Sequence, residues 1–205
     1  SNNIDIIHFF IYFAPPPPPP QKTQKKSTIK SNHPLKKNKN LNPKKILEIG
    51  TAIGFSGLLM LNCSNAVLTT VEKDGQRAEI AKENFARYGF EKRVNLVCDD
   101  AMTALKQFVN TKEQFDFVFL DGPKGQYYRY LPLLAKILNK NGAVFADDVF
   151  LHGLVRSNLP IPHKSRSMVN NMRKYLSLLE TSPSFESEVL DVEDGIAISK
   201  KIDEL

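Results

Sequence analysis

The chain has 205 residues, a length that suits one domain with a substantial core and some additional chain. Its net charge of +6 would favour a nucleic-acid-binding protein if it were spread evenly. It is not: residues 1–45 carry nine lysines against one acid, which gives +8, whereas residues 46–205 carry 19 basic and 21 acidic residues, which gives −2. The positive charge therefore belongs to an N-terminal segment, and bulk charge says little about the rest.

Residues 1–42 are expected to form an N-terminal arm, separate from a domain at 43–205. The apolar run of the arm, IDIIHFFIYFA, has only 11 residues, whereas a helix needs roughly 20 to cross a bilayer. Six prolines and a Lys- and Asn-rich stretch follow, with too little apolar surface to fold alone. We therefore expect no membrane association and a mobile arm whose lysines add salt-dependent affinity for RNA.

The two cysteines, Cys63 and Cys98, form no CxxC pair and have no histidine nearby in the sequence. They are expected to be free thiols rather than a disulfide or a zinc site. This favours a reducing compartment, the cytoplasm.

From residue 44 onwards, short apolar runs alternate with helical patterns. Strands are predicted at 44–49, 66–72, 93–98, 115–120 and 142–147, and helices at 55–63, 75–89, 100–109, 127–139 and 165–180. Two final strands, at 185–192 and 195–201, are expected to pair in antiparallel fashion. This alternation predicts an α/β fold, with a mostly parallel seven-stranded sheet, helices on both faces and an antiparallel edge pair.

A glycine-rich turn, EIGTAIG at 48–54, follows the first strand. A dinucleotide site needs a second glycine where Ala52 stands, because only glycine lets the backbone approach a pyrophosphate, so a dehydrogenase is disfavoured. Acids end the next two strands: Glu72 is placed to bind a ribose and Asp100 to meet an adenine edge. The turn and these acids together favour a ligand that contains a nucleoside.

Carboxylates also end the fourth and fifth strands. Asp121 follows the strand at 115–120, and Asp147 and Asp148 follow the next. If these strands are neighbours, the three side chains converge at one edge of the sheet, where like charges repel unless a cation lies between them. Carboxylate oxygens are ligands that Mg²⁺ prefers. The sequence therefore predicts a divalent-metal site, with Lys124 in the turn beside it.

Four stretches in order, ILEIGTAIGFS, TTVEKD, FDFVFLDGPKGQY and GAVFADDVFLHGLV, resemble the divalent-metal-dependent O-methyltransferases. This class I S-adenosylmethionine family includes the catechol and caffeoyl-CoA enzymes. The resemblance spans about residues 43–201 and is greatest to the bacterial branch that methylates 5-hydroxyuridine in the tRNA anticodon. It implies a Rossmann-like class I methyltransferase fold, S-adenosylmethionine and Mg²⁺ or Mn²⁺ as cofactors, and a homodimer.

The resemblance also implies roles for individual residues. Lys124 would be the general base, and Asp121, Asp147 and Asp148 the metal ligands. Asp148 stands where the family has Asn, which leaves the preferred metal open. The cofactor site would be lined by Glu48, Gly50, Thr51, Ser56, Glu72, Asp100 and Asp121.

Several basic residues after the fifth strand would suit an RNA backbone: Arg156, Lys164, Arg166 and Arg173. Together with the resemblance, they favour tRNA as the substrate, with 5-hydroxyuridine converted to 5-methoxyuridine. A catechol-like or other small diol is the alternative acceptor. A non-catalytic nucleoside-binding module is the alternative from another class, although binding alone does not need Asp121, Lys124 and Asp147.

Overall fold

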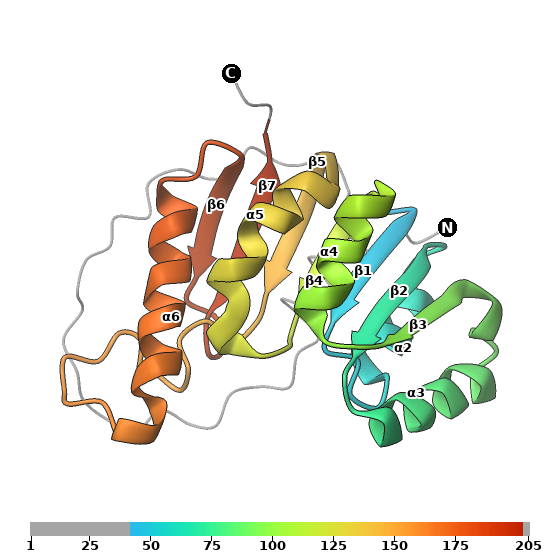
Figure 1. The fold of residues 1–205 in the computed structure, drawn as a ribbon, viewed down its shortest axis with the longest axis horizontal. Coiled ribbons are helices and arrows are strands. Elements are labelled where there is room, and N and C mark those ends of the chain that lie inside the picture. The colour runs from blue at the N-terminus through green and yellow to red at the C-terminus, as the bar shows by residue number, and fades with distance from the viewer. Residues whose placement is uncertain (1–41, 203–205) are drawn as a thin grey trace.

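A computed structural model describes residues 42–202 of the chain. The predicted N-terminal arm lies outside these residues except for Asn42, so its extent and mobility stay predictions. The described part is a single sheet with helices on both faces (Figure 1). None of its helices is long and apolar enough to cross a membrane.

The sheet has seven strands in the order β3-β2-β1-β4-β5-β7-β6. Five are parallel: β1 (Lys45–Ile49), β2 (Val67–Glu72), β3 (Val94–Cys98), β4 (Phe115–Leu120) and β5 (Leu138–Ala146). The other two are β6 (Phe185–Leu190) and β7 (Ile196–Lys201), and β7 lies between β5 and β6, antiparallel to both. The predicted mostly parallel sheet with an antiparallel edge pair is confirmed.

Helices cover the sheet from two sides because the central strands are apolar on both faces. Leu47 and Val118 face α4 (Ala101–Thr111), α5 (Tyr127–Ile137) and α6 (His163–Glu180), which lie side by side in Figure 1. Ile46 and Phe117 pack in a second core with α2 (Phe55–Cys63) and α3 (Gly75–Arg87). Two short 3₁₀ helices, η1 (Glu91–Arg93) and η2 (Lys124–Gln126), precede β3 and α5.

The structure corrects one pair of predicted boundaries. The helix predicted to reach residue 139 ends at Ile137, and the strand predicted from residue 142 begins at Leu138. Leu138 already pairs with Phe115 of β4, ahead of a shift in register, and Asn139 Nδ2 donates a hydrogen bond of 2.8 Å to Asp116 Oδ1. Pairing with β4 therefore outweighs the helical pattern over the last two residues.

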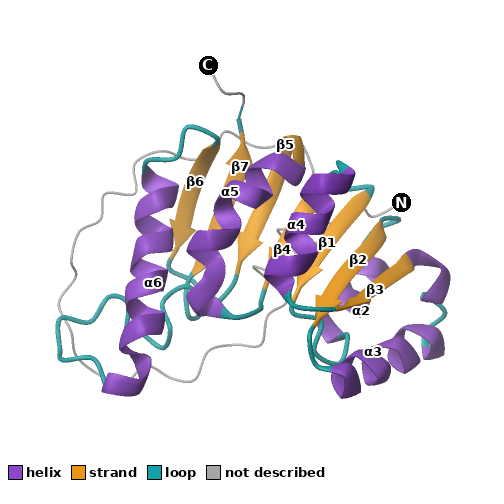
Figure 2. Cartoon of the chain, viewed as in Figure 1, coloured by secondary structure: helices purple, strands orange, loops and turns teal. Residues whose placement is uncertain are grey.

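The edge formed by the carboxyl ends of the parallel strands is where this fold can bind a ligand. The chain leaves β1 towards the α2 face and β4 towards the α5 face, so the topological switch point lies between these two neighbouring strands. Ligands of open α/β sheets bind at such a point. Figure 2 shows the loops that follow β1, β2, β4 and β5 gathered at this edge, with the turn between β6 and β7 beside them.

Candidate functional site

The glycine turn after β1 lies directly against the end of β4. The amide of Gly50 donates to Val71 O at 3.0 Å, and the amide of Asp121 donates to Ile49 O at 3.0 Å. Gly50 has a φ of 105°, and a Cβ added to it would lie 2.5 Å from Asp121 O. Only glycine allows this close approach, so the turn is fixed at the switch point.

Glu48 ties this turn together from inside the protein. Its side chain is fully buried, and its two oxygens accept hydrogen bonds from the Ser56 and Thr70 hydroxyls. Thr51 Oγ1 lies 2.5 Å from Thr70 Oγ1, which extends the network. Burial raises the pKa of Glu48 to about 7, although the two hydroxyls act in the opposite direction. The structure thus places Glu48 beneath the predicted cofactor surface, and direct contact with a cofactor stays a prediction.

The acids that end β2 and β3 hold backbone amides at the same edge. Glu72 Oε2 accepts from the amide of Ala52 and Oε1 from that of Asp74, both at 2.9 Å, which joins the glycine turn to β2. Asp100 Oδ1 accepts from the amide of Met102 at 2.9 Å and caps α4. Each carboxylate oxygen has a second lone pair. Both acids can therefore still accept hydrogen bonds from a ligand, and their contact with a nucleoside stays a prediction.

The acids of β4 and β5 meet around one ammonium group. Lys124 Nζ lies 2.7 Å from Asp121 Oδ1, 3.5 Å from Asp148 Oδ2 and 3.1 Å from the backbone oxygen of Asp147. The strands are neighbours in register, with Leu120 opposite Ala146. The predicted meeting is therefore confirmed for the side chains of Asp121, Asp148 and Lys124. Asp147 contacts Lys124 through its backbone oxygen, and the roles assigned to all four residues stay predictions.

Asp147 is partly buried, and its Oδ1 accepts from the amide of Asp148 at 2.8 Å. Burial and the adjacent charge of Asp148 raise the pKa of Asp147 to about 6. A carboxylate in this position is stabilised by any cation that comes close to it.

The three carboxylates do not form a ready-made metal cluster. Among residues 42–202, no group of three or more His, Cys, Asp or Glu side chains is placed to hold a metal ion. The ammonium of Lys124 instead takes the position between Asp121 and Asp148. The atoms around it that could bind a metal are all oxygens, from two carboxylates and one backbone carbonyl. This set fits a hard divalent cation such as Mg²⁺, provided that Lys124 moves aside.

Tyr127 belongs to the same site, although the sequence gave no reason to select it. Its ring is buried, its hydroxyl donates to Leu120 O at 2.9 Å, and Lys124 Nζ lies 5.7 Å from the ring centroid. Leu120 O also accepts from the amide of Asp147 at 3.0 Å. Tyr127 therefore fixes the end of β4 beneath the acids. The sequence alone could not have selected Tyr127, because its burial does not follow from the QYY pattern at the start of α5.

The four predicted RNA-binding residues divide into two pairs. Arg173 donates to Val155 O and Ser157 O, both at 3.0 Å, and Arg156 pairs with Asp191 at 2.8 Å. These two residues fix the loop between β5 and α6. Lys164 and Arg166 are exposed on the first turns of α6 and make no hydrogen bond or ion pair with any described residue.

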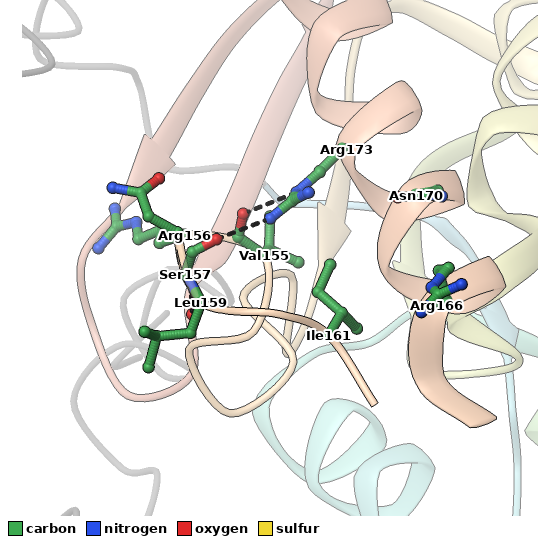
Figure 3. A pocket seen from close by; sticks show the side chains of 9 residues that line it. Val155, Arg156, Ser157, Leu159, Ile161, Arg166, Asn170 and Arg173 are labelled. Carbon is green, nitrogen blue, oxygen red and sulfur yellow. Dashed lines mark hydrogen bonds between the residues drawn. The ribbon is translucent and has the colours of Figure 1, made fainter. Parts of the chain in front are cut away.

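A cavity of about 540 Å³ lies between this loop and α6 (Figure 3). Arg166 and Asn170 face it from the helix, and Leu159 and Ile161 from the loop. Figure 3 also shows the two hydrogen bonds by which Arg173 holds the loop opposite the helix. The cavity therefore offers a cationic and partly apolar wall.

The strand order, the glycine turn and the acids at the switch point define a Rossmann-like methyltransferase fold. The chain belongs to the O-methyltransferase family, which matches residues 36–202. This match confirms the predicted O-methyltransferase family and makes the chain a methyltransferase rather than a dehydrogenase. The tRNA branch and the dependence on a divalent metal stay predictions.

Three similar proteins support this assignment. A Staphylococcus aureus protein described as a "putative caffeoyl-CoA O-methyltransferase" is 33% identical, with a TM-score of 0.71 and coverage of 78% of this chain and 77% of that one. An O-methyltransferase from Bacillus cereus, in complex with SAH, is 26% identical over 78% and 74% of the two chains, with a TM-score of 0.71. O-methyltransferase ankF of Aspergillus thermomutatus is 27% identical over 170 residues, which are 77% of this chain and 70% of that protein.

Proposed function

We propose that this O-methyltransferase transfers the methyl group of S-adenosylmethionine to the 5-hydroxyl of 5-hydroxyuridine in the tRNA anticodon, with the help of Mg²⁺ or Mn²⁺. The observation that carries the proposal is that the carboxylates of Asp121 and Asp148 and the backbone oxygen of Asp147 surround one cation position, beside the glycine turn at the switch point. The predicted homodimer and the cytoplasmic location belong to the same proposal.

The cofactor part of the proposal rests on the glycine turn and its acids. Gly50 in the turn is partly exposed, and Glu72 and Asp100 keep lone pairs that can accept further hydrogen bonds at the same edge. The Bacillus cereus relative holds SAH. We infer that the turn at Gly50 and the acids Glu72 and Asp100 would hold S-adenosylmethionine, which would supply the methyl group at this edge of the sheet.

The acceptor part rests on the acids of β4 and β5. Asp121, Asp147 and Asp148 would hold the divalent cation, which lowers the pKa of the acceptor hydroxyl and orients its oxygen when bound. Lys124 would then leave its position between the carboxylates. Once displaced, its ammonium would have to give a proton to solvent, and the resulting neutral amine would then accept the proton of the hydroxyl as the methyl group is transferred. The apolar core beneath, including Tyr127, keeps water from the acids on that side.

The substrate part rests on the start of α6. Lys164 and Arg166 are the two predicted basic residues whose side chains have no partner among the described residues. Arg166 also lines the cavity between α6 and the loop that follows β5. Single-stranded RNA loops are bound through such phosphate contacts, with a base inserted into an adjacent pocket. A tRNA anticodon loop suits this arrangement.

The test is methyl transfer from labelled S-adenosylmethionine, run in parallel with tRNA that lacks 5-methoxyuridine and with a catechol. Each reaction is run with Mg²⁺, with Mn²⁺ and with a chelator. We expect metal-dependent label in the 5-hydroxyuridine of the tRNA anticodon. Label in the catechol alone would retain the chemistry and replace the substrate by a small diol. Equal label with metal and with chelator would remove the metal from the proposal.

A further inference from the structure

The turn between β6 and β7, residues 191–195, lies against the segment that follows the two acids of β5. The amide of Val149 donates to Gly195 O at 2.9 Å, and the amide of Phe150 donates to Asp194 O at 2.7 Å. The amide of His152 donates to the carboxylate of Asp194, at 2.6 Å from Oδ2. Three amides within four residues are therefore held by a single turn from a distant part of the chain.

The segment needs such support because its backbone is strained. Asp148, Leu151 and His152 have φ values of 53°, 52° and 55°. In this left-handed region an L-residue is disfavoured by about 1–2 kcal/mol, and clusters of such residues persist only where the surroundings enforce them. Without outside contacts, the segment would relax and carry Asp148 with it.

The packing of side chains shows that the turn and the segment fit as one unit. A Cβ added to Gly195 would lie 2.3 Å from the Phe150 ring, so the turn passes as close to that ring as glycine allows. The guanidinium of Arg156 lies 3.4 Å from the centroid of the same ring and pairs with Asp191, at the start of the turn.

Asp194 is the member of this unit whose side chain holds the strained backbone. Its side chain is only 18% exposed, and the oxygen that accepts from the His152 amide also lies 3.5 Å from His152 Nδ1. Nothing else within residues 42–202 accepts a hydrogen bond from that amide. Its neighbour Glu193 is exposed and has no partner among the described residues.

We propose that Asp194 is a positioning residue for methyl transfer: through the amide of His152 it holds residues 148–152 in the conformation that keeps the carboxylate of Asp148 and the backbone oxygen of Asp147 beside Lys124. This inference rests on the proposed function, because it assigns the role with respect to those acids. Asp194 acts through the backbone and touches none of the reacting groups.

The first experiment compares Asp194→Ala with Glu193→Ala, which removes an acid from the same turn. Hydrogen exchange of the amides of residues 149–152 is expected to become about 10-fold faster in Asp194→Ala, while the amides of β7 stay protected. The affinity for Mn²⁺, measured by electron paramagnetic resonance, and kcat are each expected to fall about 10-fold, as for other residues that orient metal ligands. The affinity for S-adenosylhomocysteine stays the same, and Glu193→Ala behaves like the wild type.

Two rescues separate positioning from general folding. Asp194→Asn keeps an oxygen that can accept from the His152 amide, so it should restore most of the kcat. Adding His152→Gly to Asp194→Ala removes the strain at that φ, because glycine adopts it freely, and should recover part of the loss. Loss of S-adenosylhomocysteine binding together with kcat, without rescue by either change, would overturn the proposal.

The remaining outcomes distinguish this inference from the proposed function. Unchanged exchange over residues 149–152 overturns the role of Asp194, whatever the enzyme methylates. Faster exchange with wild-type kcat and Mn²⁺ affinity overturns it as well. If the wild type bound no Mn²⁺, the metal dependence in the proposed function would be overturned. The measurements of kcat and hydrogen exchange would still decide the role of Asp194.

Discussion

The two halves of the site are held by different kinds of contact. At the ends of β1 and β2, polar groups are buried and hydrogen-bonded to one another, as with Glu48 between Ser56 and Thr70. At the ends of β4 and β5, exposed carboxylates share the ammonium of Lys124, and a strained segment follows. The first half is held by the protein's own hydrogen bonds, without the need for a ligand. In the second half, the Lys124 ammonium neutralises the carboxylates and is carried by a flexible side chain. This suits a site in which a divalent cation would replace the ammonium.

The largest expected effect is on the half at the ends of β4 and β5, from Asp121→Asn. The substitution keeps the shape of the side chain and removes the charge that would hold a divalent cation. We expect the rate of methyl transfer to fall about 10³-fold, which corresponds to roughly 4 kcal/mol in the barrier. Initial rates at saturating cofactor would measure it. Glu79→Gln, on the exposed face of α3, is the control, and a loss of less than threefold in Asp121→Asn would contradict a role for Asp121.

Lys124→Met sharpens the comparison because two measurements should move in opposite directions. Loss of the general base should lower kcat about 10²- to 10³-fold. Loss of the competing ammonium should tighten Mn²⁺ binding about 10-fold, since a like charge no longer occupies the position. Electron paramagnetic resonance of free Mn²⁺ would follow the second effect, with Lys106→Met as the control. Wild-type or weaker Mn²⁺ affinity would show that Lys124 does not compete with a metal.

Gly50→Ala tests the half at the ends of β1 and β2. The new Cβ would lie 2.5 Å from Asp121 O, at a φ of 105° that alanine rarely adopts. We expect the free energy of unfolding to fall by about 3 kcal/mol and cofactor binding to be lost. Gly89→Ala is the matched control: φ is also positive there, at 76°, but nothing lies within 4 Å of the added Cβ. Equal losses of stability in the two variants would mean that close approach at Gly50 is unimportant.

Glu48→Gln tests the same half through pH. The pKa of Glu48 is about 7 in the folded protein, above its ordinary value of 4.5, so the folded state keeps a proton that the unfolded state has released. Its contribution is fully present below the unfolded pKa and is lost as pH rises through the folded one. We expect wild-type stability to lose up to about 3 kcal/mol relative to the Gln variant between about pH 5 and pH 8. Urea unfolding at both pH values would measure it, and parallel profiles would exclude a proton on Glu48.

The smallest effects are expected on RNA binding. Arg166→Ala and Lys164→Ala should each weaken tRNA binding about 3- to 10-fold at low salt and reduce the salt dependence by the equivalent of one phosphate contact. Lys92→Ala, in η1 at the opposite edge of the sheet, should change neither. Filter binding across a salt series would test this. A wild-type salt dependence in both α6 variants would remove them from the RNA surface.

Most of the fold was predictable because the strands are apolar runs separated by clear helical patterns. The meeting of Asp121 with Asp147 and Asp148 was also predictable, since it follows from strand ends and parallel neighbours alone. The role of Glu48 was not, because one hydroxyl partner, Ser56, depends on where α2 begins and the other, Thr70, on the register of β2 against β1. Likewise, charge could not separate Arg173 and Arg156 from Lys164 and Arg166. The carbonyl oxygens that hold Arg173 belong to an irregular loop, which has no pattern in the sequence.

The position of β7 between β5 and β6 has a consequence for synthesis of the protein. Residues up to Asp148 are made before the turn at 191–195, which supports the segment after them. The glycine turn and its acids can therefore assemble on the first four strands, while the acceptor side waits for the last hairpin to insert. A nascent chain stalled before residue 190 would be expected to bind the cofactor's nucleoside without being able to use it.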